Sequence, residues 1–416
     1  MSGIIDLARN AKQAGKDVAQ AGDREKNAFL VRLADILRNE QEKIIKSNAK
    51  DLAAAEDAGL DAARLDRLRI TGKTIEDMAV SCEEVAALKD PVGEIERMNR
   101  LSNGLQVGRM RIPLGVVAII YESRPNVTID AAILCLKAGN AVVLRGGSEA
   151  FESNKCLAGI LGRALNDSGL NGDAVAFIPT TDRKAVQEML SLDQYIDVVI
   201  PRGGEGLIRT VVEQATMPVL KHYKGVCHIY VHNDADLNMA LEIVRNAKVQ
   251  RPGVCNALEC LLVHKDIAPE FLPRLKEYLK KDNVVYKACA ASLPYLGETA
   301  FPAENSDWGR EFLALQMAVR IVESQKQASD HIYDYGSNHS EAIVTNDYSR
   351  AMRFVREIDA SAVLVNASTR FNDGGQFGLG AEIGISTSKI HAYGPMGVHE
   401  LTSSKFVAFG QGQTRD

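Results

Sequence analysis

The chain has 416 residues, which is too long for one ordinary hydrophobic core and predicts two or three domains. Its formal net charge of −5 argues against a nucleic-acid partner, because nucleic acids bind basic surfaces. No apolar stretch has the length needed to cross a bilayer, and residues 1–16 lack the apolar run of a signal peptide. The seven cysteines include no Cys-x-x-Cys pair, so they predict reduced thiols in a cytoplasmic protein, with neither a metal site nor a disulfide framework.

Residues 1–90 show helical spacing of their apolar side chains and predict several helices that act as scaffold. A hairpin signal follows, with Asn103-Gly104 between two polar strands at 97–101 and 105–110. Asn-Gly supplies the positive φ angles that a two-residue hairpin turn requires. Because the two strands hold too few apolar residues to bury a face, we expect the hairpin to need a host sheet or a second subunit.

From Gly115 onward, apolar strands alternate with helices. This alternation predicts an α/β fold with a doubly wound parallel sheet, and a second α/β block begins near Gly225. The predicted strands are residues 115–121, 141–144, 174–178, 196–200, 228–231, 258–263 and 405–409. The predicted helices are residues 126–137, 149–167, 185–190, 205–214, 237–247 and 268–280.

Cys255 is the first candidate for a catalytic residue. It lies in a predicted loop, residues 250–257, directly after Gly253, where glycine lets the backbone fold closely around a substrate. A thiol suits acyl chemistry, because thiols readily yield a nucleophilic thiolate. By position alone, a buried loop cysteine without a chemical role is an equally good interpretation. Cys260 falls within the following strand and is expected to pack in the core.

Two Gly-Gly turns are candidates for phosphate binding. Each follows a predicted parallel strand, opens a helix and carries an arginine, and the N–H groups at a helix N-terminus favour an anion. Neither turn matches Gly-x-Gly-x-x-Gly, so an ordinary Rossmann dinucleotide site is not predicted. The turn residues are Arg145, Gly146, Gly147 and Ser148 in the first, and Pro201, Arg202, Gly203 and Gly204 in the second.

The segment 121–126 also follows a predicted strand. Its polar residues Ser123, Arg124 and Asn126 offer groups that hold an oxyanion or an anionic substrate. For Asn126, a helix N-cap in a turn is the alternative interpretation.

The stretch from residue 367 onward is polar and rich in glycine, which predicts a long functional loop. Arg370 and Lys389 of this loop are expected to meet a carboxylate or a phosphate, and a solvated surface loop is the alternative. The spacing of the histidines does not indicate a metal site, so satisfied or exposed histidines are expected.

Several long motifs occur in a fixed order between about Gly115 and Lys405 without a large gap. They are YESRPNVT (121–128), GNAVVLRGGSEA (139–150), PRGGEGL (201–207), QRPGVCNALE (250–259), ASTRFNDGGQFG (367–378) and GISTSKIHAYGPMG (384–397). This set is highly specific, and it resembles the γ-glutamyl phosphate reductase branch of the aldehyde dehydrogenase superfamily.

The resemblance implies an aldehyde dehydrogenase-like fold and a homo-oligomer, either a dimer or a tetramer. It implies a doubly wound cofactor-binding domain, an α/β catalytic domain and a small β oligomerisation element. The expected boundaries are 1–96 and 111–225 for the cofactor-binding domain with its N-terminal helices, 226–365 for the catalytic domain, 97–110 and 385–416 for the oligomerisation element, and 366–384 for a return to the cofactor-binding domain.

The activity implied by the resemblance is the reduction of L-glutamyl 5-phosphate to L-glutamate 5-semialdehyde with NADPH, the second step of proline synthesis from glutamate. Cys255 is then the nucleophile that forms a thioester, and its N–H together with Asn126 would hold the oxyanion. Arg145 stands where the superfamily has a lysine that touches the cofactor ribose, and Glu311 resembles the glutamate that holds the nicotinamide ribose. A glutamate 5-kinase that hands over the labile acyl phosphate is a candidate partner.

By the same resemblance, the two Gly-Gly turns contribute to cofactor binding. The residues expected at the substrate or its phosphate are Ser123, Arg124, Arg202, Arg370 and Lys389.

The sequence departs from its relatives at two places. Hydrolytic aldehyde dehydrogenases carry a general-base glutamate where residues 220–225 read LKHYKG, without a carboxylate, which fits a thioester resolved by phosphate and protected from water. Tyr393 stands where the family tail has an arginine, so the contact of that arginine is not expected here.

Three alternatives remain open at this point. A CoA-acylating aldehyde dehydrogenase also lacks the glutamate base. A cysteine acyltransferase or amidase would use Cys255 without a redox step, and a catalytically silent interaction protein would need no reactive thiol at all.

Overall fold

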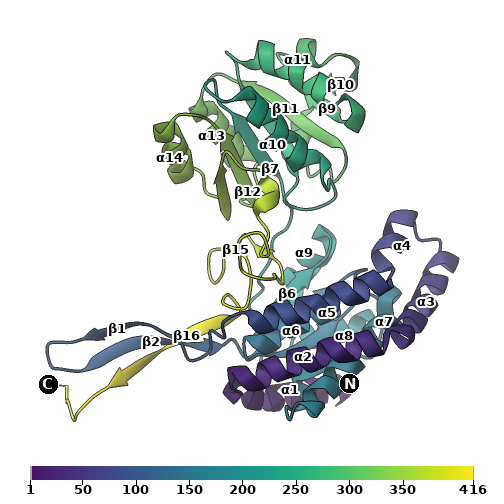
Figure 1. The fold of residues 1–416 in the computed structure, drawn as a ribbon, viewed down its shortest axis with the longest axis vertical. Helices are drawn as coiled ribbons and strands as arrows, with labels where there is room; N and C mark the ends of the chain where they lie inside the picture. Colours follow the sequence, from purple (N-terminus) through teal and green to yellow (C-terminus); the bar gives the residue numbers. More distant parts are fainter. Residues whose placement is uncertain (1, 416) are drawn as a thin grey trace. The chain divides into compact units, whose positions relative to one another are not determined.

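The computed structural model describes residues 2–415, and these fold into two compact units. Each unit contains its own parallel sheet with helices packed against it (Figure 1). The first unit consists of Met1–Lys221, Gly378–Gly384 and Met396–Asp416, and the second of His222–Phe377 and Ile385–Pro395.

A four-stranded parallel sheet lies at the centre of the first unit. Its strand order is β5-β4-β3-β6, so the chain begins near the middle and winds toward both edges, as in a doubly wound fold. Val117 of β3 pairs with Val142 on one side and with Val198 on the other. The strands are β3 (Val116–Tyr121), β4 (Ala141–Arg145), β5 (Val175–Phe177) and β6 (Val198–Arg202).

Helices pack around this sheet and bury its strands. The helix α6 lies beside α7, and α1 lies beside α8 and against β4, while α2 packs on α5, α6 and α7. The buried ammonium of Lys137 in α6 donates to Asp23 and to Asn27, both at 2.6 Å, and so ties α2 to the sheet layer. The helices are α1 (Ser2–Gln20), α2 (Asp23–Asn39), α3 (Gln41–Asp57), α4 (Ala62–Leu68), α5 (Gly72–Ala87), α6 (Val127–Lys137), α7 (Phe151–Asp167), α8 (Arg183–Leu190) and α9 (Glu205–Gln214).

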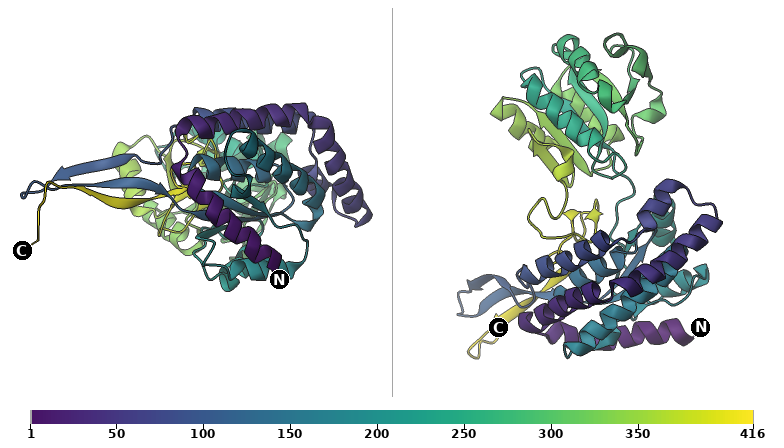
Figure 2. Two further views of the ribbon diagram at one scale, coloured as in Figure 1. Left: turned by 90° about the horizontal axis from the view of Figure 1, so that it is seen from below. Right: turned by 45° about the vertical axis from the view of Figure 1, so that its right-hand side comes forward.

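The predicted hairpin forms part of a three-stranded antiparallel sheet in order β1-β2-β16, and this sheet extends away from the helices of the first unit (Figures 1 and 2). Its host strand is the C-terminal strand, since Met110 pairs with Lys405. The strands are β1 (Ile95–Arg100), β2 (Gln106–Pro113) and β16 (Thr402–Phe409).

The turn of this hairpin differs from the prediction of a two-residue Asn-Gly turn. Leu101 and Leu105 are joined by a 2.8 Å backbone hydrogen bond, and the Gly104 N–H donates to the Leu101 carbonyl at 2.9 Å. In this described turn, the positive φ belongs to Gly104 alone, at 87°. This is a three-residue hairpin loop with glycine in the left-handed position, which also matches the strand twist. Asn-Gly therefore predicts the position of the turn correctly, but the loop has three residues and not two.

The second unit is built on a seven-stranded parallel sheet in order β10-β9-β11-β8-β7-β12-β13. The central strands are buried on both faces, which explains their continuous apolar sequences. The strands are β7 (Cys227–Val231), β8 (Leu258–His264), β9 (Val285–Ala288), β10 (Ala300–Pro302), β11 (Gln316–Val322), β12 (Ser340–Val344) and β13 (Ala362–Val365).

Alternate residues of these strands face two separate clusters of apolar side chains. Leu261 joins a cluster with residues of α10 and α11, while Cys260 and Leu262 join one with residues of α13 and α14. The helices are α10 (Leu237–Val249), α11 (Ala268–Tyr278), α12 (Leu293–Leu296), α13 (Gln325–Tyr335) and α14 (Tyr348–Glu357), and a small pair of strands adds β14 (Ile385–Ser386) and β15 (Gly394–Pro395). Of the helices that the structure describes, none has both the length and the apolar character to cross a membrane.

The segments expected to form an oligomerisation element are divided between the units. Residues 97–110 and 396–415 pack with the first unit, and residues 385–395 with the second. Their part in oligomerisation stays a prediction.

Candidate active site

Cys255 lies at the amino-terminal edge of the parallel sheet in the second unit. It precedes β8, residues 222–225 precede β7, and His339 directly precedes β12. Because β8, β7 and β12 are adjacent and parallel, their amino ends meet at one edge. The fold thus brings together three segments that are far apart in the sequence, around a half-buried thiol.

The backbone of Cys255 is fixed by very close packing. A Cβ atom on Gly225 would lie only 1.8 Å from the Cys255 carbonyl oxygen, so glycine is required at that position. The buried thiol of Cys227 donates to the same carbonyl oxygen at 3.1 Å. The backbone of residue 255 is therefore held against the segment that leads into β7.

The next residue, Asn256, anchors the loop to the segment after β13. Its Nδ2 donates to the carbonyl of Asn372 at 3.0 Å, and its own carbonyl accepts from Oγ1 of Thr369 at 2.7 Å. Arg370 contacts the Asn256 side chain and donates from Nε to Gln250 at 3.0 Å. Burial lowers the pKa of Arg370, as does the nearby Arg251. The predicted Cys255 loop and Arg370 are thus in direct contact.

Two histidines lie beside Cys255, which the sequence did not indicate. One ring nitrogen of His222, one of His339 and the Cys255 sulfur all lie within 4.8 Å of one another. The two rings meet edge to face, with centroids 5.5 Å apart. His222 Nδ1 is 2.8 Å from the carbonyl oxygen of Ile385. No local spacing could reveal this arrangement, because parallel pairing alone brings the residues together.

Glu311 contacts the same segment from another side. Its carboxylate accepts from the Gly225 N–H at 3.0 Å, and Lys224 Nζ donates to the Gly309 carbonyl at 2.8 Å. The Gly309–Glu311 stretch is therefore fixed to the residues before β7. The role of Glu311 at a cofactor ribose stays a prediction.

Lys389 and Tyr393 share one partner, Asp359. Lys389 Nζ lies 2.6 Å from a carboxylate oxygen of Asp359, and the Tyr393 hydroxyl donates to the other at 3.1 Å. The Lys389 ammonium also lies 5.6 Å from the centre of the Tyr393 ring. The tyrosine that replaces the family arginine is thus accommodated through Asp359, which sequence reasoning did not single out.

The remaining predicted residues belong to the first unit. Arg145 ends β4 and donates to the Gly146 carbonyl at 2.8 Å and weakly to the Thr181 carbonyl at 3.4 Å. Burial lowers the pKa of Arg145; Glu149 opposes this effect and the nearby Arg183 guanidinium adds to it. Two arginines therefore gather at the end of β4, although the sequence indicated only one of them.

A carboxylate of the chain itself lies beside each Gly-Gly turn. Gly204, at the start of α9, donates its N–H to Glu122 at 2.9 Å, and a Cβ on Gly203 would lie 2.4 Å from that carboxylate. Beside the first turn, Glu149 accepts from the N–H and the hydroxyl of Ser123 at 2.7 and 2.6 Å. These internal acids occupy the Gly204 N–H and the donors of Ser123, which were expected to meet a bound anion.

Asn126 lies just before α6 and donates from Nδ2 to Asp130 at 2.9 Å. Burial raises the pKa of the Asp130 carboxyl to about 6, against the opposing effects of Asn126 and Arg202. Arg202 packs over Gly384, where a Cβ would lie 2.8 Å from its Nη1. Ser148 begins a short 3-10 turn that leads into α7. The roles of these residues toward a ligand remain predictions.

A second, fully buried cluster of sulfur and imidazole lies between the sheet and α13. It contains His228, Cys260 and His331, and Arg320 Nη1 lies 2.7 Å from His331 Nδ1. A guanidinium only donates, so His331 must carry its proton on Nε2, which points at the Cys260 sulfur at 3.4 Å. Burial, His228 and Arg320 lower the pKa of His331 to about 2. This tautomer leaves His331 no free lone pair for a metal, and Cys260 packs in the buried apolar cluster, as predicted.

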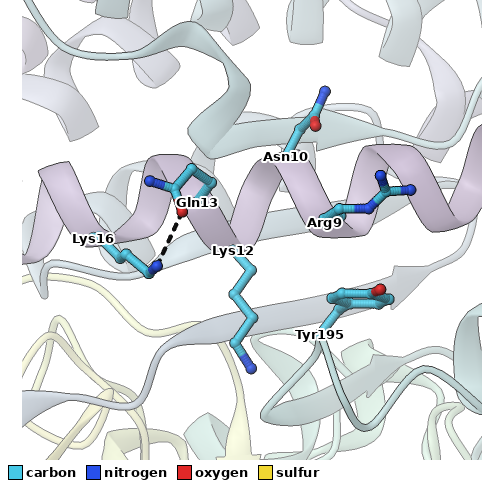
Figure 3. Close-up of a pocket in the computed structure, with 6 residues that line it drawn as sticks. All are labelled: Arg9, Asn10, Lys12, Gln13, Lys16 and Tyr195. Atoms are coloured by element: carbon cyan, nitrogen blue, oxygen red, sulfur yellow. Dashed lines mark hydrogen bonds between the residues drawn. The ribbon is translucent and has the colours of Figure 1, made fainter.

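One pocket of the first unit lies along α1 (Figure 3). It is lined by Arg9, Asn10, Lys12, Gln13, Lys16 and Tyr195. Lys12 donates to the Gln194 carbonyl at 2.8 Å, Lys16 to Gln13 at 2.9 Å, and Arg9 contacts Asp6. Its basic groups are thus already engaged, and it contains none of the predicted site residues.

Comparisons with known proteins identify the family of the chain. The aldehyde dehydrogenase family matches residues 3–288, which is more than half of the chain. The γ-glutamyl phosphate reductase of Nitratidesulfovibrio vulgaris is 60% identical over 414 residues, covering 100% of this chain and 99% of its own.

Solved structures extend the comparison to the fold. The γ-glutamyl phosphate reductase of Thermotoga maritima is 45% identical, with a TM-score of 0.97 over 99% of this chain and 100% of its own. An acetylating aldehyde dehydrogenase from Geobacillus thermoglucosidasius shares the fold, with a TM-score of 0.73 at 18% identity over 100% of this chain and 98% of its own. The chain belongs to the aldehyde dehydrogenase family, and within it to the γ-glutamyl phosphate reductases.

Proposed function

We propose that this protein reduces L-glutamyl 5-phosphate to L-glutamate 5-semialdehyde and phosphate, with NADPH, through a thioester on Cys255 in proline biosynthesis. The observation that carries the proposal is the 60% identity over 414 residues to a protein named γ-glutamyl phosphate reductase. The position of Cys255 supports it, because a half-buried thiol with a fixed backbone suits nucleophilic attack on a bound acyl carbon.

In the proposed reaction, the Cys255 sulfur attacks the acyl carbon and the bond from that carbon to the phosphate oxygen breaks. The Cys255 N–H, and Asn126 as the second candidate donor, hold the oxyanion. NADPH supplies the hydride that converts the thioester to a thiohemiacetal. Collapse of the thiohemiacetal then breaks the carbon–sulfur bond, releases the semialdehyde and restores the thiol.

NADPH, rather than NADH, is favoured by the charge near the end of β4. Arg145 and Arg183 are close enough for one guanidinium to affect the pKa of the other. Two neighbouring guanidinium groups suit the extra phosphate of NADPH, through charge-assisted hydrogen bonds. For the nicotinamide ribose, Glu311 is the proposed acceptor, and the two Gly-Gly turns complete the proposed cofactor site.

Substrate binding is assigned to a set of polar and basic residues. Arg370 directly contacts the residue that follows the nucleophile, which makes it the best placed candidate for the substrate phosphate or carboxylate. The other proposed residues are Ser123, Arg124, Arg202 and Lys389. A glutamate 5-kinase is a candidate source of the labile acyl phosphate, and a cytoplasmic site of action fits the reduced cysteines.

The direct test uses the reverse reaction. NADPH formation from glutamate 5-semialdehyde and NADP should require phosphate, because residues 220–225 provide no carboxylate to activate water at the thioester. We expect the steady-state rate without phosphate, at matched ionic strength, to be lower by on the order of a hundredfold. Equal rates with and without phosphate would mean an ordinary hydrolytic enzyme, and a rate restored by CoA instead would mean a CoA-acylating one.

The sheet β1-β2-β16 is the proposed oligomerisation surface. It exposes Phe406 by 74% and Phe409 by 56%, together with Met98 by 40%, and exposed aromatic residues on a polar sheet mark a contact between proteins. We expect Phe406→Ser with Phe409→Ser to shift sedimentation from the dimer or tetramer toward the monomer, without a change in circular dichroism. Phe301→Ser is the control, because Phe301 is 51% exposed in the other unit. An oligomer unchanged by the double substitution would contradict this assignment.

A further inference from the structure

We infer that His222 is the base that takes the proton from Cys255 and then passes it to the departing phosphate. This inference deepens the proposed function and rests on it for the identity of the leaving group. The histidine ring and the thiol belong to the same unit, so the argument needs only contacts within that unit.

The hydrogen bond to Ile385 determines which nitrogen of His222 is basic. Nδ1 lies 2.8 Å from a backbone carbonyl oxygen, and a carbonyl only accepts hydrogen bonds. Nδ1 must therefore carry the proton, and neutral His222 keeps its lone pair on Nε2. The fixed ring is then a base with one acceptor atom and one orienting partner, which is the arrangement that activates a cysteine nucleophile.

The distance and the burial of His222 agree with this role. A ring nitrogen of His222 lies within 4.8 Å of the Cys255 sulfur, and catalytic contacts of this kind commonly tighten when substrate binds. Both residues are half-buried, so both are reachable by an acyl phosphate. Lys224, two residues after His222, donates to the Gly309 carbonyl and is therefore directed away from Cys255.

His339 is the less suitable of the two histidines. It is fully buried, and its Nδ1 lies 2.8 Å from the Ser340 hydroxyl and 3.8 Å from the Cys227 sulfur. A fully buried ring that contacts interior side chains can hold the site in place, whereas the base must be accessible to the substrate. We therefore assign His339 to positioning and His222 to proton transfer.

The proton balance of the reaction follows from this assignment. Cys255 loses its proton to Nε2 of His222 as the carbon–sulfur bond forms. The phosphate leaves as the bond from the acyl carbon to its oxygen breaks, and it takes that proton, which returns His222 to its neutral form. After hydride transfer, collapse of the thiohemiacetal leaves a thiolate that recovers one proton from water through His222, in agreement with the single proton that the reduction consumes.

The test measures thiol reactivity without any substrate. The second-order rate constant for alkylation of Cys255 by iodoacetamide, followed by mass spectrometry, should fall at least tenfold in His222→Asn near neutral pH. An asparagine amide can still donate to the Ile385 carbonyl, so the ring's structural contact is retained while the base is lost. The kcat for reduction should fall by roughly 10²-fold or more, the usual contribution of a general base.

Two further variants make the outcome decisive. In His222→Ala, added imidazole should restore part of the alkylation rate and of the turnover, which a purely structural histidine would not allow. His399→Gln, an exposed histidine of the other unit, should behave as the parent protein. Unchanged alkylation in both His222 variants, or a loss seen only with His339→Gln, would overturn the inference.

These results separate the inference from the proposed function. Alkylation involves no acyl phosphate, so it reports on His222 even if the substrate is a different acyl compound. A phosphate-independent enzyme with a His222-dependent thiol would refute the proposed substrate and keep the base. A phosphate-dependent enzyme whose thiol is alkylated at the same rate with and without His222 would support the proposed substrate and refute the role of His222.

Discussion

Cys255→Ser should lower turnover by on the order of 10³-fold or more in both directions, while the fold remains intact. A serine hydroxyl is far harder to deprotonate than a thiol, so the first step loses its nucleophile. An oxygen ester would also be a poorer hydride acceptor than a thioester, and an alkoxide a poorer leaving group than a thiolate. The substitution removes little volume, since it replaces sulfur by oxygen within a half-buried loop.

The measurement combines single-turnover kinetics with mass spectrometry of the trapped intermediate. The parent protein should accumulate an acyl adduct on the peptide that contains Cys255 when the cofactor is left out, and the serine variant should not. Cys289→Ser is the matched control, because Cys289 is another half-buried thiol of the same unit, 3.2 Å from the Ser292 hydroxyl, and it should keep its activity. A serine variant that retains a tenth of the parent rate would contradict the covalent mechanism.

The parallel α/β architecture could be predicted from the sequence because each strand is a continuous apolar run. The residues 205–214 were predicted as a helix and form α9 with the same bounds, since Gly203 and Gly204 precede it and an amphipathic pattern fills it. The strand predicted at 196–200 instead begins at Val198, because hydrophobicity marks burial and not the point where pairing starts. Boundaries are thus the weaker part of such predictions.

The candidate site could be predicted only where one motif contains the whole feature. The loop around Cys255 and the candidate Arg370 were within reach, because each lies in a recognisable motif, but their contact was not predicted. His222 and His339 were not, since they become neighbours of Cys255 only through the order of β8, β7 and β12. Residue spacing can indicate ligands that lie on one helix, strand or loop. It cannot indicate residues from different strands that meet at one edge of a sheet.

The Gly-Gly turns show a different limit. Their sequence correctly predicts tight backbone at the carboxyl end of a parallel strand, with an N–H directed outward. It does not predict that Glu122 occupies the N–H of Gly204, because the acid comes from a neighbouring strand end. An internal carboxylate and an external phosphate satisfy the same donor, so glycine and helix position alone cannot distinguish them.

Gly225→Ala should cost nearly all activity, by at least about a hundredfold. The added methyl group would lie 1.8 Å from the Cys255 carbonyl oxygen, 2.6 Å from its carbonyl carbon and 2.7 Å from its Cα. All three atoms belong to the backbone, so no side-chain rotation can relieve the overlap. The loop must therefore move away from the segment before β7, and the Cys227 contact that holds the Cys255 carbonyl separates with it.

The effect on function should exceed the effect on stability. Overpacking of this kind costs typically about 1–3 kcal/mol of unfolding free energy, which a thermal melt followed by circular dichroism would show as a modest decrease. The nucleophile, however, needs placement within a fraction of an ångström, so displacement of its backbone also removes it from the reach of His222. Iodoacetamide should then alkylate Cys255 of the variant more slowly than that of the parent, in parallel with the loss of turnover.

Gly159→Ala provides the matched control for this substitution. Gly159 lies exposed within α7, a Cβ there would meet nothing within 4 Å, and alanine should stabilise the helix by roughly 0.5–1 kcal/mol. The same glycine-to-alanine change would thus stabilise the protein at Gly159 and abolish activity at Gly225, because only Gly225 lacks space for a methyl group. If Gly225→Ala kept the parent rate, the loop would have to accommodate the methyl group without moving Cys255, and the close packing seen here could not be what positions the nucleophile.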